Sequence, residues 1–235
     1  MSQTPTPAPV SYLARFSLVE RAAHWLLAAT FAGMLASGVF IGGAGPIGGR
    51  AMLTVHVGFA TVLVAGVAAM TVLRRPRRRL SATAADLRRI GGMERRWLRE
   101  GPLRMLRRQP LPPAGRFNGG QKLNSMLLFG MLVALYATGT GALTGRVDAL
   151  HPLSLLRPLG ALHGAVAVAM SAVVVAHIYL GAIHPDTRHA LHGMLRGSVR
   201  RDWALEHHAD WVRQLDAEAV SGRARRAAEA PADRG

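Results

Sequence analysis

Uncharged, largely apolar blocks alternate with basic, polar stretches along this chain. Four blocks lack Asp, Glu, Lys and Arg altogether: Ala22–Gly49, Ala51–Leu73, Leu123–Gly145 and Leu159–Ile183. Each block exceeds the roughly 20 residues that a helix needs to cross a hydrocarbon core about 30 Å thick. The pattern therefore predicts an all-α integral membrane protein, a four-transmembrane-helix bundle with spans over residues 20–42, 51–73, 121–145 and 158–183.

Basic residues are distributed unevenly between the two ends of this bundle. Of the 29 lysines and arginines, 26 precede the first uncharged block, lie between the second and third, or follow the fourth. The positive-inside rule assigns that side to the cytoplasm, so we predict that both termini are cytoplasmic. A net charge of +16 would by itself suggest a nucleic-acid partner. Because the positive charge follows the membrane topology, we do not expect the chain to bind nucleic acid. We expect its spans to be surrounded by membrane lipid.

The spans divide the chain into three parts. We assign residues 1–14 to a flexible N-terminal lead, 15–197 to the membrane domain and 198–235 to a cytoplasmic tail. The lead lacks a basic segment and a small-residue cleavage site, which argues against a signal peptide. The tail predicts an amphipathic cytoplasmic helix, followed beyond Ser221 by a composition typical of disorder. A further interfacial helix is expected near Ala84–Leu98, and we find no internal repeat.

The chain has no cysteine and ten histidines. The absence of cysteine excludes disulfides, thiolate-bound iron–sulfur clusters and haem attached through a CxxCH motif. A metal centre in this chain must therefore be held by histidine or carboxylate side chains. Five histidines of the tail region follow no spacing typical of a metal site: His184, His189, His192, His207 and His208.

Four other histidines fall inside the predicted spans: His24, His56, His163 and His177. Ionisable residues at membrane depth are costly and usually functional. His163 and His177 are 14 residues apart in one span, about 21 Å along a helix and within about 40° of one face. The directions of the spans place His56 at the depth of His163, near the outer surface. They place His24 at the depth of His177, near the cytoplasmic surface.

This layout predicts two bis-histidine haems stacked across the membrane. His56 and His163 would hold the outer haem, and His24 and His177 the inner one. Without a CxxCH motif the haems are b-type, and two axial histidines leave no open iron position, which favours electron transfer over oxygen binding.

Other uses of these histidines fit less well. A single metal site needs three or four ligands at one depth, and a proton relay needs acidic partners that the spans lack. A haem-free membrane scaffold or transporter, with histidines serving helix packing, is the alternative from a different class.

Several motifs together resemble the γ subunit of respiratory formate dehydrogenase. They are, in chain order, Arg15-Phe16, Glu20-Arg21, His24-Trp25, His56, Phe117-Asn118-Gly119-Gly120-Gln121-Lys122-Leu123, His163, His177, Arg201-Asp202-Trp203, His207-His208 and Trp211. The similarity extends over residues 12–215 and implies a di-haem cytochrome b of the bacterial inner membrane. It further implies an iron–sulfur partner subunit, a catalytic dehydrogenase subunit, and menaquinone or ubiquinone as the electron acceptor. The nearest alternative is the cytochrome b of a hydrogenase or of a thiosulfate or polysulfide reductase.

The resemblance also gives a role to the segment that leads into the third span. It implies that Asn118, Gly120 and Gln121 border the quinone site beside the inner haem. The residues alone leave a second interpretation open, because Asn118 followed three residues later by Gln121 is a helix-capping pattern. Lys122, the only lysine of the chain, could supply a proton, contact a propionate or extend to the membrane surface. Arg15 is a candidate partner for a haem propionate. Since the chain lacks iron–sulfur ligands and a sizeable soluble domain, it is not expected to oxidise formate itself.

Overall fold

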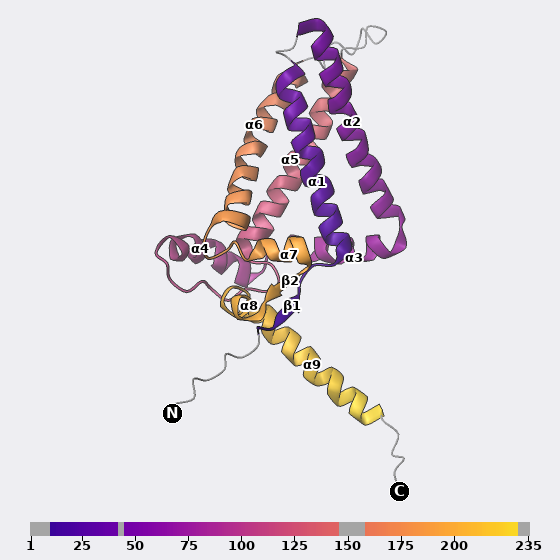
Figure 1. The fold of residues 1–235 in the computed structure, drawn as a ribbon. Coiled ribbons are helices and arrows are strands. Elements are labelled where there is room, and N and C mark those ends of the chain that lie inside the picture. Colours follow the sequence, from indigo (N-terminus) through magenta and orange to yellow (C-terminus); the bar gives the residue numbers. More distant parts are fainter. Residues whose placement is uncertain (1–9, 42–44, 146–157, 230–235) are drawn as a thin grey trace, which may run out of the picture.

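A computed structural model describes residues 10–41, 45–145 and 158–229 of this chain. Figure 1 shows the long apolar helices above a layer of short helices and a small sheet, from which the C-terminal helix projects away. The elements, in chain order, are β1 (Tyr12–Ala14), α1 (Leu18–Ile41), α2 (Gly45–Val72), α3 (Arg74–Arg88), α4 (Gly92–Leu106), α5 (Gly119–Thr144), α6 (Leu159–Ile178), the π-helical turn η2 (Tyr179–Ile183), α7 (Ala190–Arg196), β2 (Ser198–Arg200), α8 (Arg201–His207) and α9 (Ala209–Glu229).

Four of these segments are long and apolar enough to cross a membrane: Leu18–Ile41, Gly48–Val72, Gly119–Thr144 and Leu159–Ile183. The last segment joins α6 to η2. The all-α four-helix architecture is confirmed, and no predicted boundary is displaced by more than three residues. Few side chains in the spans are buried within the protein, because the outward faces of membrane helices are covered by lipid and not by a protein core.

The spans form two helical hairpins. α1 packs closely against α2, and α5 packs closely against α6. In the first hairpin, a Cβ at Gly33 would lie 2.5 Å from the ring of Phe59, and one at Gly66 would lie 2.4 Å from Leu26. Among the described residues, the contacts between spans of different hairpins are less extensive than the contacts between the two spans of one hairpin. The hairpins are therefore two packing units that face each other.

The polar layer at the basic end of the bundle is called the cap here and comprises residues 10–17, 74–118 and 184–215. Between the second and third spans the cap contains two helices, α3 and α4, which are separated at residues 89–91. The single interfacial helix predicted over residues 84–98 is therefore wrong. The break is stabilised by Gly91, whose N–H donates to Oε2 of Glu94 at 2.8 Å and so satisfies a free amide at the start of α4.

Lys122 connects α3, α4 and α5. Its buried ammonium donates to Oε1 of Glu94 at 2.8 Å and to the carbonyl of Arg89 at 3.1 Å, and it lies 3.2 Å from Oδ1 of Asp86. The side chain is 5% exposed, so it does not extend to the membrane surface. It is the centre of an ion-pair cluster that joins the loop helices to the third span.

The N-terminal segment takes part in the cap. Strand β1 pairs antiparallel with β2, with Leu13 opposite Val199, so residues 12–14 are not part of a flexible lead and that prediction is corrected. The chain enters β2 through Gly197, which has a φ of 85° and accepts hydrogen bonds from the N–H groups of Arg15 and Phe16 at 2.7 and 3.0 Å. A Cβ at Gly197 would lie 2.7 Å from the carbonyl oxygen of Phe16. Glycine is therefore required by both conformation and space.

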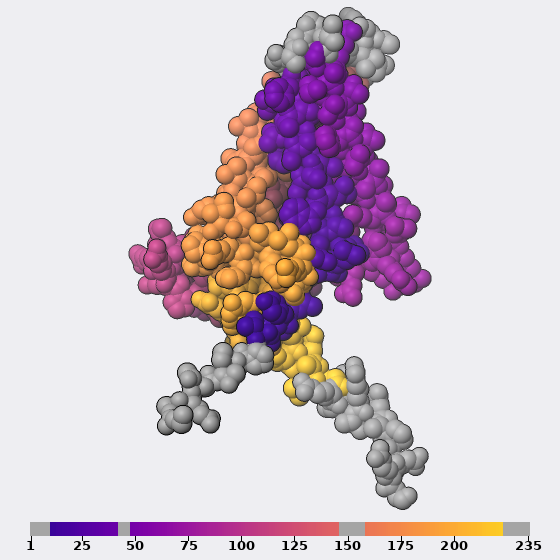
Figure 2. Space-filling model, viewed as in Figure 1, coloured from indigo at the N-terminus to yellow at the C-terminus, as the bar shows by residue number. Residues whose placement is uncertain are grey.

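The tail forms β2, α8 and α9 where a single amphipathic helix was predicted. α9 continues to Glu229, so the disorder predicted beyond Ser221 is corrected as far as that residue. Apolar residues from these elements form the buried core of the cap: Val199, Trp203, Ala204, Trp211 and Val212. The apolar spacing in the tail therefore serves this core. In Figure 2 the orange and yellow cap residues lie against the lower end of the indigo α1.

Candidate functional site

Two pairs of histidines face each other between the hairpins. His56 on α2 and His163 on α6 form the outer pair, with ring centroids 6.0 Å apart and ring planes at 73°. His24 on α1 and His177 on α6 form the inner pair, with centroids 6.2 Å apart and planes at 51°. The structure thus brings together the partners that membrane depth predicted. That they hold haem iron stays a prediction at this point.

Both separations fit two imidazoles that share one metal ion. Two metal–nitrogen bonds of about 2 Å, plus about 1 Å from each ring centre to its nitrogen, give a centroid separation of about 6 Å. A direct N–H···N hydrogen bond would bring the nitrogens to about 3 Å and the centroids to about 5 Å. Among the described residues, no hydrogen bond joins the two rings of either pair. The geometry favours ligation over helix packing through paired histidines.

Each histidine of the outer pair is oriented by a backbone carbonyl of the neighbouring helix. Nδ1 of His56 donates to the carbonyl of Met34 on α1 at 2.9 Å. Nδ1 of His163 donates to the carbonyl of Leu135 on α5 at 3.0 Å. Because a carbonyl only accepts, the proton sits on Nδ1, and Nε2 keeps its lone pair for a metal. This bond also fixes the ring and strengthens it as a ligand.

The inner pair is supported differently and lies against the cap. The side-chain amide of Asn124 is 3.3 Å from Nδ1 of His177. Nδ1 of His24 is buried and has no hydrogen-bond partner among the residues that the structure describes. The adjacent Trp25 donates from Nε1 to the carbonyl of Met194 in α7 at 3.3 Å, which ties this end of α1 to the cap. The π-helical turn η2 begins two residues after His177, and such turns often occur at functional sites.

A hydroxyl followed by glycine occupies equivalent places in the two hairpins. Oγ of Ser37 is 3.2 Å from Nδ1 of His56, and Oγ1 of Thr138 is 3.3 Å from Nδ1 of His163. The matching sequences are Met34-Leu35-Ala36-Ser37-Gly38 and Leu135-Tyr136-Ala137-Thr138-Gly139. The two spans thus share a short Ala-Ser/Thr-Gly motif, which was visible in the sequence but was not recognised there.

Asn118 and Gln121 form a complete capping box at the start of α5. The Gln121 N–H donates to Oδ1 of Asn118 at 2.8 Å, and the Asn118 N–H donates to Oε1 of Gln121 at 3.1 Å. The capping interpretation is confirmed, and neither side-chain NH₂ group takes part in it. Gly120 permits close packing of α4, because a Cβ there would lie 2.5 Å from the ring of Trp97. A quinone role for these residues stays a prediction.

Arg15 points into the cap and contacts the tail. Its Nη2 donates to the carbonyl of Arg116 at 2.7 Å, to Nε2 of His208 at 3.0 Å and to Oε1 of Gln121 at 3.4 Å. His208 can accept because its own Nδ1 donates to the carbonyl of Gly115 at 2.8 Å. Burial, followed by repulsion from Arg116, lowers the pKa of Arg15 to about 9, so it is a cation at neutral pH. The link from His208 through Arg15 to Gln121 joins segments too distant in sequence to be foreseen.

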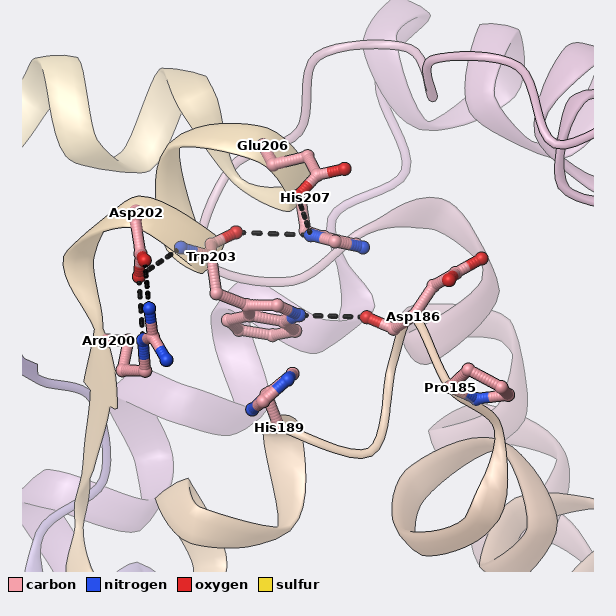
Figure 3. A pocket seen from close by; sticks show the side chains of 8 residues that line it. All are labelled: Pro185, Asp186, His189, Arg200, Asp202, Trp203, Glu206 and His207. Atoms are coloured by element: carbon pink, nitrogen blue, oxygen red, sulfur yellow. Dashed lines mark hydrogen bonds and ion pairs between the residues drawn. The ribbon is translucent and has the colours of Figure 1, made fainter.

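The cap also contains a pocket of about 320 Å³, shown in Figure 3. Its lining residues are Pro185, Asp186, His189, Arg200, Asp202, Trp203, Glu206 and His207. Trp203 donates from Nε1 to the carbonyl of Asp186 at 2.9 Å and stacks on His207 at 4.9 Å between ring centroids. In the part of the chain that the structure describes, no three His, Cys, Asp or Glu side chains are grouped to hold a metal ion. The pocket includes none of the paired histidines.

Comparison with known proteins is consistent with this geometry. The sequence model described as prokaryotic cytochrome b561 matches residues 15–197. Similar proteins include the cytochrome b556(Fdn) subunits of the nitrate-inducible formate dehydrogenases of Escherichia coli K12, Escherichia coli O157:H7 and Shigella flexneri. Each is 27% identical over 102 residues, which is 43% of this chain and 46% of the relative. The chain thus spans about half the length of the curated relatives it matches.

Proposed function

The chain belongs to the prokaryotic cytochrome b561 family, and we propose on that premise that it is the membrane electron-transfer subunit of a formate dehydrogenase-type complex. The family implies b-type haem, and the four apolar helices make the chain a multi-pass protein of the bacterial inner membrane. The proposal adds two haems, a quinone as acceptor, and partner subunits that oxidise formate and carry iron–sulfur clusters.

The observation that carries this proposal is the presence of two opposed histidine pairs at different depths of one bundle. His56 and His163 would hold the outer haem, and His24 and His177 the inner one. Their ring separations of 6.0 and 6.2 Å leave room for one iron between each pair. When bound, the haems would supply one-electron redox chemistry. The protein orients the imidazoles and surrounds them with apolar helices.

The proposed quinone site lies where the inner pair meets the start of α5. His177 and Asn124 are in contact there, and Asn118, Gly120 and Gln121 form the first turn of the helix that carries Asn124. Amide NH₂ groups outside the capping box are suitable donors to a quinone carbonyl. Arg15 supports the site indirectly, because its hydrogen bond to Oε1 of Gln121 helps to orient that amide.

A spectrum of the purified complex with haem quantitation tests the proposal. We expect two b-type haems per chain, reduced by formate and reoxidised by a soluble quinone analogue. One haem per chain, or none, would contradict the two-site assignment. Haems reduced by hydrogen but not by formate would instead assign the chain to a hydrogenase, and the copurifying soluble subunit would identify the donor.

Conservative substitutions separate quinone binding from helix capping. Asn118→Asp and Gln121→Glu keep the oxygen acceptors of the capping box but remove the NH₂ donors. If the amides bind quinone, reoxidation of the inner haem by the quinone analogue should slow about 10- to 100-fold, the worth of one lost hydrogen bond to a reacting group. Asn118→Ala is the matched control for capping and should cost about 1 kcal/mol of unfolding free energy. Normal reoxidation in both conservative variants would contradict the quinone role and show that these residues serve only to cap the helix.

The two glycines of the repeated motif provide a second test, which is confined to the outer pair. A Cβ at position 139 would lie 2.9 Å from Cε1 of His163, whereas one at position 38 would lie 3.6 Å from His56. Because the His163 ring is held by Leu135, Gly139→Ala should weaken retention of the outer haem about 10-fold. Gly38→Ala is the matched control and should retain it. Haem titration against each apoprotein measures both, and equal retention would contradict the assigned geometry.

A further inference from the structure

We propose that a pocket at the junction of α2 and α3 binds the phosphate of an anionic glycerophospholipid from the surrounding membrane leaflet. The pocket has a volume of about 320 Å³ and is lined by Val72, Arg74, Arg77, Arg78 and Ser81. Its lining residues run from the end of α2 into the first half of α3, and Figure 1 shows the corner between these two helices. None of its lining residues belongs to a histidine pair or to the proposed quinone site, and the pocket does not depend on the function proposed above.

Helical geometry places the three arginines on one face of α3. At about 100° per residue, positions 74, 77, 78 and 81 fall within about 100° of arc. Thr83 and Asp86 lie on the opposite side and are held by the bundle, because Thr83 donates to Oε1 of Glu20 at 2.5 Å and Asp86 lies 3.2 Å from Nζ of Lys122. These contacts fix the rotation of α3, so the arginine face stays directed away from the protein.

Among the described residues, the three guanidinium groups form no ion pair, and the same holds for Arg75 and Arg79 of this helix. Other arginines of the cap are paired, such as Arg116 with Glu20 and Arg104 with Glu100. Like charges three and four residues apart on a helix repel one another. An anion in the pocket would relieve this repulsion, and phosphate matches the planar donor fork of arginine.

The surroundings favour a lipid phosphate over a free one. Val72, which is 80% exposed, and Leu73, which is 57% exposed, end the apolar span that leads into the pocket. The pocket therefore joins a strip of apolar surface to a cluster of positive charge, at the level where a membrane changes from acyl chains to headgroups. A phospholipid satisfies both parts, with its phosphate on the arginines and its chains along α2.

The test compares two double variants that remove equal charge. Arg77→Gln/Arg78→Gln alters the pocket, and Arg75→Gln/Arg79→Gln alters exposed arginines of α3 that do not line it. The full chain in neutral detergent would be titrated with phosphatidylglycerol, phosphatidylcholine or inorganic phosphate, and binding would be followed by native mass spectrometry and thermal shift. We expect one tightly retained phosphatidylglycerol, bound about 30-fold more weakly by the pocket variant and within about 2-fold of normal by the control.

Three outcomes would overturn the proposal. Equal loss in the two variants would indicate attraction to the overall charge of α3. If inorganic phosphate binds with the same affinity as phosphatidylglycerol, the pocket is a site for soluble anions. Equal binding of phosphatidylcholine would remove the requirement for an anionic lipid. Haem content provides the check that both variants are folded.

Discussion

Replacing His56 with alanine is expected to remove one of two b-type haems and leave the other in place. The same haem should be lost in His163→Ala, because the two rings face each other at 6.0 Å. His24→Ala and His177→Ala should both remove the second haem, for the equivalent reason. Pyridine haemochrome analysis gives the haem count per chain, and a potentiometric titration shows which of the two redox transitions has disappeared.

His189→Ala is the control for this series, since His189 is an exposed histidine of the cap that belongs to neither pair. It should keep both haems. Loss of different haems in His56→Ala and His163→Ala would overturn the pairing. Full haem content in all four variants would show that these histidines serve helix packing.

Lys122→Met is expected to give the largest loss of stability. The substitution strands the carboxylate of Glu94, whose side chain is 14% exposed, and also removes the partner of Asp86. Breaking a buried ion pair from one side costs about 3 kcal/mol or more. In a chain of this size that corresponds to a fall in Tm of about 6–12 °C, measurable by thermal unfolding of the detergent-solubilised protein.

A second substitution distinguishes the stranded charge from simple loss of packing. Lys122→Met/Glu94→Leu removes both members of the main pair, so it should recover part of the lost Tm. If the double variant is less stable than Lys122→Met, the carboxylate is not the cause. Lys122→Arg keeps the charge and should fall between wild type and Lys122→Met.

The penalty of Lys122→Met should depend on pH. Burial alone would raise the pKa of the Glu94 carboxyl, but hydrogen bonds from Lys122 and from the Gly91 N–H bring it below its ordinary value. A group whose pKa is lower in the folded state contributes its full stabilisation of that state above its unfolded pKa, which is about 4.3 for glutamate. This contribution is lost as the pH falls through the pKa of the folded state. The Tm difference between wild type and variant should therefore narrow below about pH 4.

The histidine pairs could be predicted because membrane depth restricts which residues meet. A span has a direction and a fixed axial rise, so the position of a residue along the chain gives its depth in the membrane. In a four-helix bundle, a histidine at a given depth has few other histidines with which it could pair. The partners of their Nδ1 atoms escaped prediction. They are backbone carbonyls of Met34 and Leu135. Every residue has a backbone carbonyl, so the residue types do not show which carbonyl accepts the hydrogen bond.

The cap was predicted poorly for a related physical reason. Its core residues come from the tail, with Leu13 of the N-terminal segment packed against them. Strand β1 exists only through pairing with β2. Arg15 was expected near the inner haem because it precedes the first span, yet its contacts with His208 and Gln121 direct it into the cap. Such long-range contacts give no local periodicity.

The sequence by itself determined the four spans, their alternating directions and the two depths at which histidines gather, because hydrophobic length and axial rise are local properties of a helix. The tertiary structure decided how those histidines are oriented, that Lys122 is buried between two carboxylates, and which arginines form no ion pair in the part of the chain that the structure describes. These features depend on which side chains from distant segments meet, and burial makes each such meeting costly unless charge and hydrogen bonds are matched.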